Sequence, residues 1–112
     1  MVKPKIELIT LPPPESVNIA KEIEALREAL AGLHGPDARK IRNAFSDVDD
    51  ELAKDQPDKD EVGQALERAL GYATKAEGFA DKVESLAPRV ANAVSWLGDN
   101  WHKLLAVVGL AI

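Results

Sequence analysis

The fold class is indicated first by residues 19–33, which read IAKEIEALREALAGL. Apolar side chains recur in this stretch at steps of four, three, four and three residues, at Ile19, Ile23, Leu26, Leu30 and Leu33. This spacing places them on one face of an α-helix, as expected of a helix that buries a single stripe. The stretch predicts an amphipathic helix over residues 16–33, with Ser16 as its N-cap and Gly35-Pro36 as its stop.

Three further segments show the same stepping of apolar residues. Their bounds are predicted at 37–55, 58–86 and 89–110, and the apolar seam of the last segment includes Trp101. The first two helices are separated by a very short turn, and helices joined in this way pack as antiparallel neighbours. We therefore predict an all-α, antiparallel four-helix bundle-like domain, in which a helical hairpin packs on two longer helices.

The boundaries of the two later helices depend on glycine and proline, two residue types that disturb helices. A straight helix over residues 58–86 would reach ~43 Å, against about 28 Å for each of the first two. We expect a bend or break near Gly78, with Gly71 as the other candidate, because glycine weakens a helix interior by up to ~1 kcal/mol relative to alanine. Pro88 either begins a new antiparallel helix or kinks a continuous one. We favour the first possibility, in which the chain turns before Pro88 and a new antiparallel helix begins.

Composition and charge narrow the functional classes. The 112 residues make one domain, and 14 basic against 19 acidic residues give a net charge of −5. This balance disfavours a non-specific nucleic-acid binder, which needs a basic surface. The chain has no cysteine, which excludes a disulfide framework, a thiolate zinc site and a cysteine nucleophile. This composition fits a reducing compartment, and we expect a cytoplasmic protein.

The first 14 residues differ from the rest of the chain. Residues 5–11 have the β-branched content of a strand, and three prolines follow them. An isolated strand leaves backbone groups unpaired, so it must lie over the helices, pair with the edge of another chain, or stay loosely ordered. We predict a short extended N-terminal arm over residues 1–14 and a helical domain over residues 15–112. Strand addition to a partner is the alternative role for the arm.

Neither end of the chain predicts a signal peptide or a transmembrane helix. The apolar stretch from Ile6 to Leu11 is too short for a signal-peptide core and contains Glu7. A membrane-spanning helix needs ~20 predominantly apolar residues. Only residues 104–112 are free of polar side chains near the C-terminus, and at 1.5 Å per residue they reach about 13 Å. That length does not span a bilayer.

No motif predicts catalysis, a metal or a cofactor. The sequence has no glycine-rich phosphate loop, no G-x-S-x-G and no H-E-x-x-H. Asp99 and His102 stand three residues apart, which we interpret as a surface pair and not as half of a di-iron site. Residues 47–61 carry eight acids, but a calcium loop would need glycine where Leu52 stands. We interpret this run as a solvated acidic corner, with docking of a basic partner as the alternative.

The C-terminal helix carries the predicted partner-binding residues. From residue 104 onward its side chains are apolar on every side, and a helix of that kind is buried all round or inserted in something. Trp96 falls on a polar face, so we expect its large ring to be exposed. The predicted partner-binding residues are Trp96, Lys103, Leu105, Val107, Leu110 and Ile112.

Part of the chain resembles a known pattern. The residues concerned are Glu51-Leu52-Ala53-Lys54, Pro57-Asp58-Lys59, Val62, Leu66, Leu70 and Leu86-Ala87-Pro88. This run, over about residues 45–90, resembles the E-L-x-K-x-x-P-D-K-x-x-V pattern of small helical effector-associated modules of bacterial conflict and defence systems. The resemblance implies protein–protein interaction in a bacterial cytoplasm, with no catalytic residues.

We therefore predict a non-enzymatic helical interaction module that self-associates or recruits a larger, defence-related effector through its C-terminal helix. Its partner is a protein or a second copy of the chain. The alternative is a peripheral membrane protein that inserts its apolar C-terminal segment, with Trp96 and Lys103 at headgroup level. We favour the first hypothesis because interfacial helices are usually rich in Lys and Arg, whereas residues 88–112 offer only Arg89 and Lys103.

Overall fold

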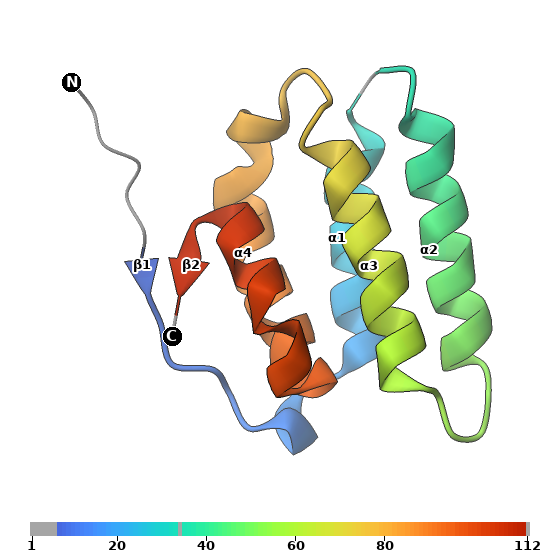
Figure 1. Cartoon of the computed structure of the whole chain (residues 1–112), viewed down its shortest axis with the longest axis vertical. Helices are drawn as coiled ribbons and strands as arrows, with labels where there is room; N and C mark the ends of the chain where they lie inside the picture. The colour runs from blue at the N-terminus through green and yellow to red at the C-terminus, as the bar shows by residue number, and fades with distance from the viewer. Residues whose placement is uncertain (1–6, 34, 112) are drawn as a thin grey trace.

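The computed structural model describes residues 7–33 and 35–111, and these residues form an all-α protein (Figure 1). The prediction of an all-α fold is confirmed. The α-helices are α1 (Ile19–Ala31), α2 (Ala38–Leu52), α3 (Lys59–Ala73) and α4 (Phe79–Leu97). Two 3₁₀ helices, η1 (Pro14–Ser16) and η2 (Asp99–Val108), and two short strands, β1 (Glu7–Leu8) and β2 (Leu110–Ala111), complete the described elements.

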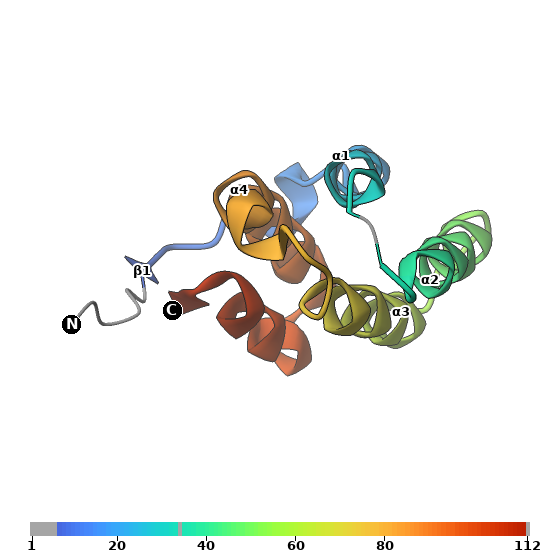
Figure 2. The same cartoon turned by 90° about the horizontal axis from the view of Figure 1, so that it is seen from above.

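The helices lie in two layers. Seen from above, α1 and α4 form one layer, and α2, α3 and η2 form the other (Figure 2). α2 packs along α3, while α1 and η2 both pack along α4, and far fewer contacts join α1 to α2. Between the layers lies one apolar core, in which the predicted seam residues Leu26 and Leu66 are each 1% exposed.

The first helix begins three residues later than predicted. Asn18 is its N-cap, because the Asn18 side chain accepts a hydrogen bond from the Lys21 N–H. Ser16, the predicted cap, lies in η1 and donates its hydroxyl to the Pro13 carbonyl. The prolines before Ser16 favour this tight 3₁₀ turn, and the turn delays the start of the α-helix.

The break near Gly78 is confirmed, but the predicted bounds 58–86 and 89–110 are wrong. Gly78 has a φ of 90°, in the left-handed region that glycine adopts without strain, and it separates α3 from α4.

Pro88 lies inside α4, so the favoured turn at this residue is also wrong. The reason is that buried apolar residues continue through the proline at helical spacing, at Leu86, Val90, Val94 and Leu97. Because Pro88 has no N–H, the Glu84 carbonyl lacks its usual helical donor, and the side chains of both residues are exposed.

The predicted helix to residue 110 ends instead at Leu97. Gly98, with a φ of 105°, reverses the chain, and η2 returns along α4 (Figure 1). After η2, β2 pairs in parallel with β1, with Glu7 opposite Leu110 and Leu8 opposite Ala111. The Ile9 N–H extends this pairing by donating to the Ala111 carbonyl at 2.9 Å. The described part of the N-terminal arm therefore pairs with the C-terminal segment of its own chain, while residues 1–6 lie outside the described residues.

Candidate functional site

The predicted partner-binding residues do not form one exposed patch. Leu105 and Leu110 are buried by the chain itself, with 1% and 6% of their surface exposed. Trp96 and Val107 are half-buried and Lys103 is exposed. Ile112 lies outside the described residues. The two leucines are not available at the surface, because η2 packs on α4 and β2 pairs with β1.

The two lysines near the tryptophans are engaged within the chain. The Lys59 ammonium lies 4.8 Å from the centre of the Trp96 ring, an arrangement typical of a cation–π contact. Lys103 lies over the Trp101 ring at 4.9 Å and pairs with Glu67 at 3.0 Å. The Lys59–Trp96 contact links α3 to α4, and the Lys103–Glu67 pair links η2 to α3. A partner that binds here must compete with them.

Trp101 is buried in the core, as its position on the apolar seam predicted. It is 6% exposed, and its Nε1–H donates to Asp60 at 3.0 Å. Its ring lies directly against the backbone of α3, since a Cβ added to Gly63 would stand 2.3 Å from the Trp101 Cε2 atom. Only glycine allows this close approach.

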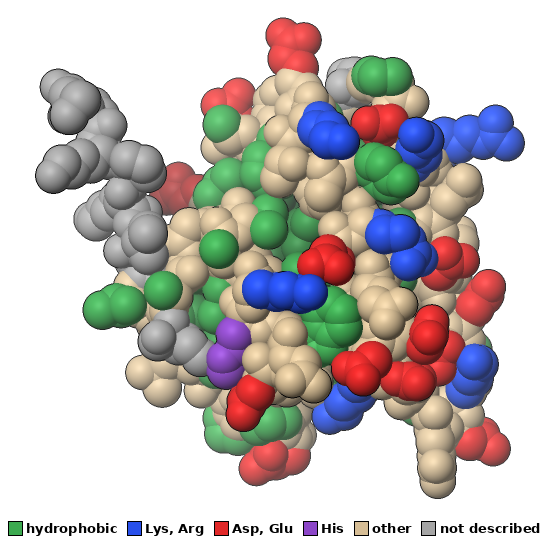
Figure 3. Space-filling model, in the orientation of Figure 1, with side chains coloured by type: hydrophobic (Ala, Val, Ile, Leu, Met, Phe, Trp, Pro, Cys, Tyr) green, Lys and Arg blue, Asp and Glu red, His purple; other side chains and the backbone are tan. Residues whose placement is uncertain are grey.

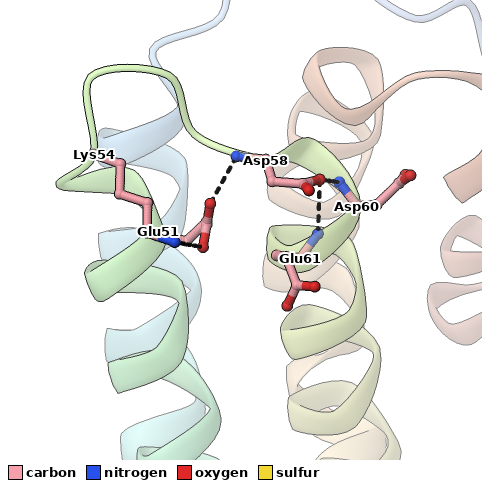
Figure 4. A network of polar contacts seen from close by, with 5 residues as sticks. All are labelled: Glu51, Lys54, Asp58, Asp60 and Glu61. Atoms are coloured by element: carbon pink, nitrogen blue, oxygen red, sulfur yellow. Dashed lines mark hydrogen bonds and ion pairs between the residues drawn. The ribbon is translucent and has the colours of Figure 1, made fainter.

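The acidic run contributes to folding through several of its members (Figure 4). The buried Glu51 carboxylate accepts a hydrogen bond from the Asp58 N–H at 2.8 Å and pairs with Lys54 at 2.9 Å. These two contacts, the backbone hydrogen bond first, hold the pKa of Glu51 below its ordinary value of 4.5. Pairing with Glu51 raises the pKa of Lys54 above 10.5. The Asp58 side chain accepts from the N–H groups of Asp60 and Glu61, and so caps α3.

The remaining polar pairs do not assemble a chemical site. His102 Nε2 lies 3.5 Å from Asp99 Oδ1 on the surface of η2, the i, i+3 pair expected from the sequence. Asp47 pairs with Arg68, which links α2 to α3. Within residues 7–33 and 35–111, no cluster of three or more His, Asp or Glu side chains is placed to hold a metal ion.

A groove of about 400 Å³ lies between α1 and α2. We call it the α1–α2 groove. The lining residues are Arg27, Leu30, Ala31, Leu33, Ala38, Ile41, Arg42, Phe45, Ser46 and Asp49. Its deepest lining residues, Leu30, Leu33, Ile41 and Phe45, are buried in the core, whereas Ala31, Arg42, Ser46 and Asp49 are exposed. Such a combination of an apolar lining with a few polar groups is typical of binding sites.

Arg27 bridges the two helices at one end of the α1–α2 groove. Its guanidinium lies 5.6 Å from the centre of the Phe45 ring and donates to Asp49 at 2.6 Å. It also pairs with Glu24, one turn earlier on α1, at 3.1 Å. The charge of Arg27 is therefore balanced by two carboxylates.

The other rim cation, Arg42, has a different environment. Arg42 is exposed and forms no ion pair with any residue that the structure describes. Lys and Arg side chains lie over the upper part of α2, whereas Asp and Glu gather around the lower ends of α2 and α3 (Figure 3). The upper end of α2 is its N-terminus, where the helix dipole favours acids over bases.

A second hollow, of about 500 Å³, lies between the first half of α4 and the end of the chain. We call it the C-terminal hollow. Its lining includes Ile9, Val83 and Val108, and Glu84 is the one charged residue among the described residues that line it. It lies at the part of the chain where partner binding was predicted, and its lining includes Leu110 from the predicted set.

The α1–α2 groove was not predicted from the sequence. Leu30, Leu33, Ile41 and Phe45 were recognised only as core-facing residues, because which helices pair closely is not encoded in the periodicity of one segment. One signal was present. Residues 38–42 contain three bases, Arg39, Lys40 and Arg42, in the first turns of a predicted helix, where acids are the usual choice.

Comparisons of the chain with models of protein families, with curated proteins and with solved structures find no match.

Proposed function

We propose that this protein is a non-enzymatic helical interaction module that docks a partner in the α1–α2 groove. The observation that carries the proposal is the groove itself, an apolar hollow of about 400 Å³ between two consecutive helices, with a cation at its rim that has no partner among the described residues. The partner is a protein effector or a second copy of the chain. The resemblance to effector-associated modules supports a bacterial, defence-related setting, and the absence of cysteine supports a cytoplasmic one.

The arrangement of the helices supplies the reason for the groove. We propose that α1 to α4 form an antiparallel four-helix bundle-like domain, with η2 as an additional packed helix. The close pairs in it are α2 with α3 and α1 with α4. Because α1 and α2 each pack mainly on another helix, the space between them is left partly open.

The alternative location for the interface is the surface around Trp96, Lys103 and Val107, which we call the C-terminal surface. It retains Trp96, Val107 and Lys103 as accessible side chains, but Leu105 and Leu110 face the core. The same burial reduces the apolar surface on which the membrane alternative rests, and none of the described helices is long and apolar enough to cross a bilayer. We therefore favour the α1–α2 groove over the C-terminal surface and over a lipid surface.

Selection of phage-displayed peptides on the folded protein tests the proposal. The bait proteins are the natural chain, Ala31→Trp and Ala20→Trp. Both alanines are exposed on α1, but only Ala31 lines the groove. We expect the peptides enriched on the natural chain to bind Ala20→Trp and to be lost on Ala31→Trp, because the indole fills the groove.

Two outcomes of the selection would overturn the groove as the docking site. One is that no peptide is enriched. The other is enrichment of peptides that bind Ala31→Trp unchanged and are lost on Trp96→Ala, which places the interface at the C-terminal surface. Sedimentation velocity at high micromolar concentration identifies a second copy as the occupant if a dimer forms and Ala31→Trp abolishes it.

A further inference from the structure

We propose that residues 7–11 act as a strap, which opens and closes over the C-terminal hollow while the helices stay folded. In the structure the strap is closed, with β1 paired to β2 and Ile9 lining the hollow. The inference goes beyond the proposed function, because no residue of the α1–α2 groove takes part in it.

The strap contributes little to the core. None of residues 8–21 is buried, and the buried apolar side chains begin at Ile23. Leu8 is 78% exposed, and Ile9 and Leu11 are half-buried. A segment that buries so little apolar surface can detach without unfolding the rest of the protein.

Few hydrogen bonds hold the tip of the strap. β1 and β2 pair over two residues each, and the Ile9 N–H adds one hydrogen bond to the Ala111 carbonyl at 2.9 Å. Both strands lie at the edge of the molecule (Figures 1 and 2). A two-stranded pair of this length has little stability of its own.

The other end of the strap is fixed, which gives the opening a defined hinge. The Ser95 hydroxyl of α4 donates a hydrogen bond to the Pro12 carbonyl, and η1 packs on α4 just after it. Three consecutive prolines stiffen this part of the chain, since the proline ring fixes φ. Thr10 and Leu11 belong to no helix or strand, so the chain bends between Ile9 and Pro12 when the strap opens.

Opening of the strap uncovers apolar surface. Val108 and Leu110 line the hollow together with Ile9, and they are 3% and 6% exposed while the strap is closed. On the α4 side of the hollow, Val83 and Ala87 are half-buried. The strap therefore controls how much of the predicted partner-binding segment, to which Leu110 belongs, the chain presents to its surroundings.

Hydrogen exchange of the natural chain, followed by nuclear magnetic resonance, tests the strap. We expect the Ile9 amide to be protected at least about a hundredfold less than the slowest amides of α4. Low concentrations of urea should leave the exchange of Ile9 unchanged and accelerate that of α4, because a local opening exposes little new surface. Equal protection and equal urea dependence at Ile9 and in α4 would overturn the strap, since the arm would then detach only when the helices unfold.

Two variants on opposite faces of the strap show what the opening uncovers. Ile9→Asp places a carboxylate in the hollow that Glu84 also lines, whereas Leu8→Asp makes the same change at an exposed side chain. We expect Ile9→Asp to raise the fluorescence of the apolar dye anilinonaphthalene sulfonate at least about threefold, and Leu8→Asp to leave it unchanged. Circular dichroism should show the same helix content in both variants. Equal dye binding by the two variants, or loss of helix in Ile9→Asp, would overturn the strap.

A disulfide between the strands locks the strap in its closed position. Leu8 and Ala111 stand opposite each other in the sheet, and the chain has no cysteine of its own, so Leu8→Cys combined with Ala111→Cys introduces a single pair of thiols. We expect oxidation to raise the protection of the Ile9 amide at least about tenfold, and reduction to reverse the change. The same protection in the oxidised and reduced forms would show that the strap does not open.

Discussion

At the scale of single residues, the contact between Trp101 and Gly63 joins η2 to α3. The ring lies against the α3 backbone, where any side chain at residue 63 would collide with it. The same ring donates a hydrogen bond to Asp60, also in α3, and is covered by Lys103. The place of the C-terminal segment on the helices therefore depends on the absence of one methyl group.

Two glycines of α3 give opposite predictions for substitution by alanine. Alanine is ordinarily the better helix former by about 1 kcal/mol, and we expect this gain for Gly71→Ala, whose added Cβ meets nothing within 4 Å. For Gly63→Ala we expect a loss of about 1 to 3 kcal/mol, because the Trp101 ring must move. Urea unfolding of both variants measures the difference. Equal gains at the two positions would show that Trp101 does not lie on Gly63.

The sequence predicted the burial of Trp101 but not its reason. Trp101 falls on an apolar seam, and this was sufficient to place it in the core. The need for glycine at residue 63 depends on which helix faces which, and the stepping of one segment contains no information about that. Trp96, which was expected to be exposed, is half-buried beneath Lys59, a residue of another helix.

Glu51 gives a prediction about pH. Its pKa is lowered in the folded protein, so the folded state is favoured at pH values above the ordinary value of 4.5, and this contribution is lost as the pH falls through the lowered value. We expect Glu51→Gln to reduce the free energy of unfolding at about pH 7 and to have little effect at an acidic pH below the lowered pKa of Glu51, where the carboxyl is protonated. Urea titrations at both pH values measure it. A difference that does not depend on pH would contradict the contacts in Figure 4.

At the scale of elements, the helix ends differ in how they are capped. Asp58 caps α3 with two hydrogen bonds, whereas Asp37 makes no capping hydrogen bond at the start of α2. We expect Asp58→Ala to lower the free energy of unfolding by about 1 kcal/mol and Asp37→Ala to lower it by much less. Thermal unfolding compares the two variants. If Asp37→Ala costs as much as Asp58→Ala, the α2 terminus is stabilised differently from what the structure describes.

Pro88 distinguishes a continuous α4 from two helices joined by a turn. In the interior of a helix a proline removes a hydrogen bond, so we expect Pro88→Ala to raise the free energy of unfolding by about 1 to 3 kcal/mol. At the first position of a new helix a proline is favourable, and the same substitution would then be neutral or destabilising. A calorimetric measurement of the unfolding temperature tells which arrangement holds.

The sequence located the break between α3 and α4 but not the true helix bounds. Gly78 weakens any helix that contains it, and this effect is local enough to be recognised in the sequence. The continuity of α4 through Pro88 depends on the burial of Leu86 and Val90 against other helices. The end of α4 at Leu97 depends on a positive φ at Gly98 and on the packing that this reversal makes possible.

At the scale of the whole molecule, the pairing of helices decides where a partner can bind. The sequence predicted an all-α fold with a buried core, and it predicted an apolar tail that a partner covers. Leu105 and Leu110 of this tail are buried by the chain itself, because the N-terminal strand pairs with the C-terminal one and η2 packs on α4. The opening lies between α1 and α2, the two helices whose short connection suggested close packing.

Docking of a partner between α1 and α2 is tested by nuclear magnetic resonance. A groove-selected peptide is added to the ¹⁵N-labelled protein, and the shifts of the backbone amides and of the two tryptophan indole N–H groups are followed. We expect shifts concentrated in residues 27–33 and 38–49, with the indole signals of Trp96 and Trp101 unchanged. Shifts concentrated at Trp96 and residues 103–111, with residues 38–49 unaffected, would contradict it.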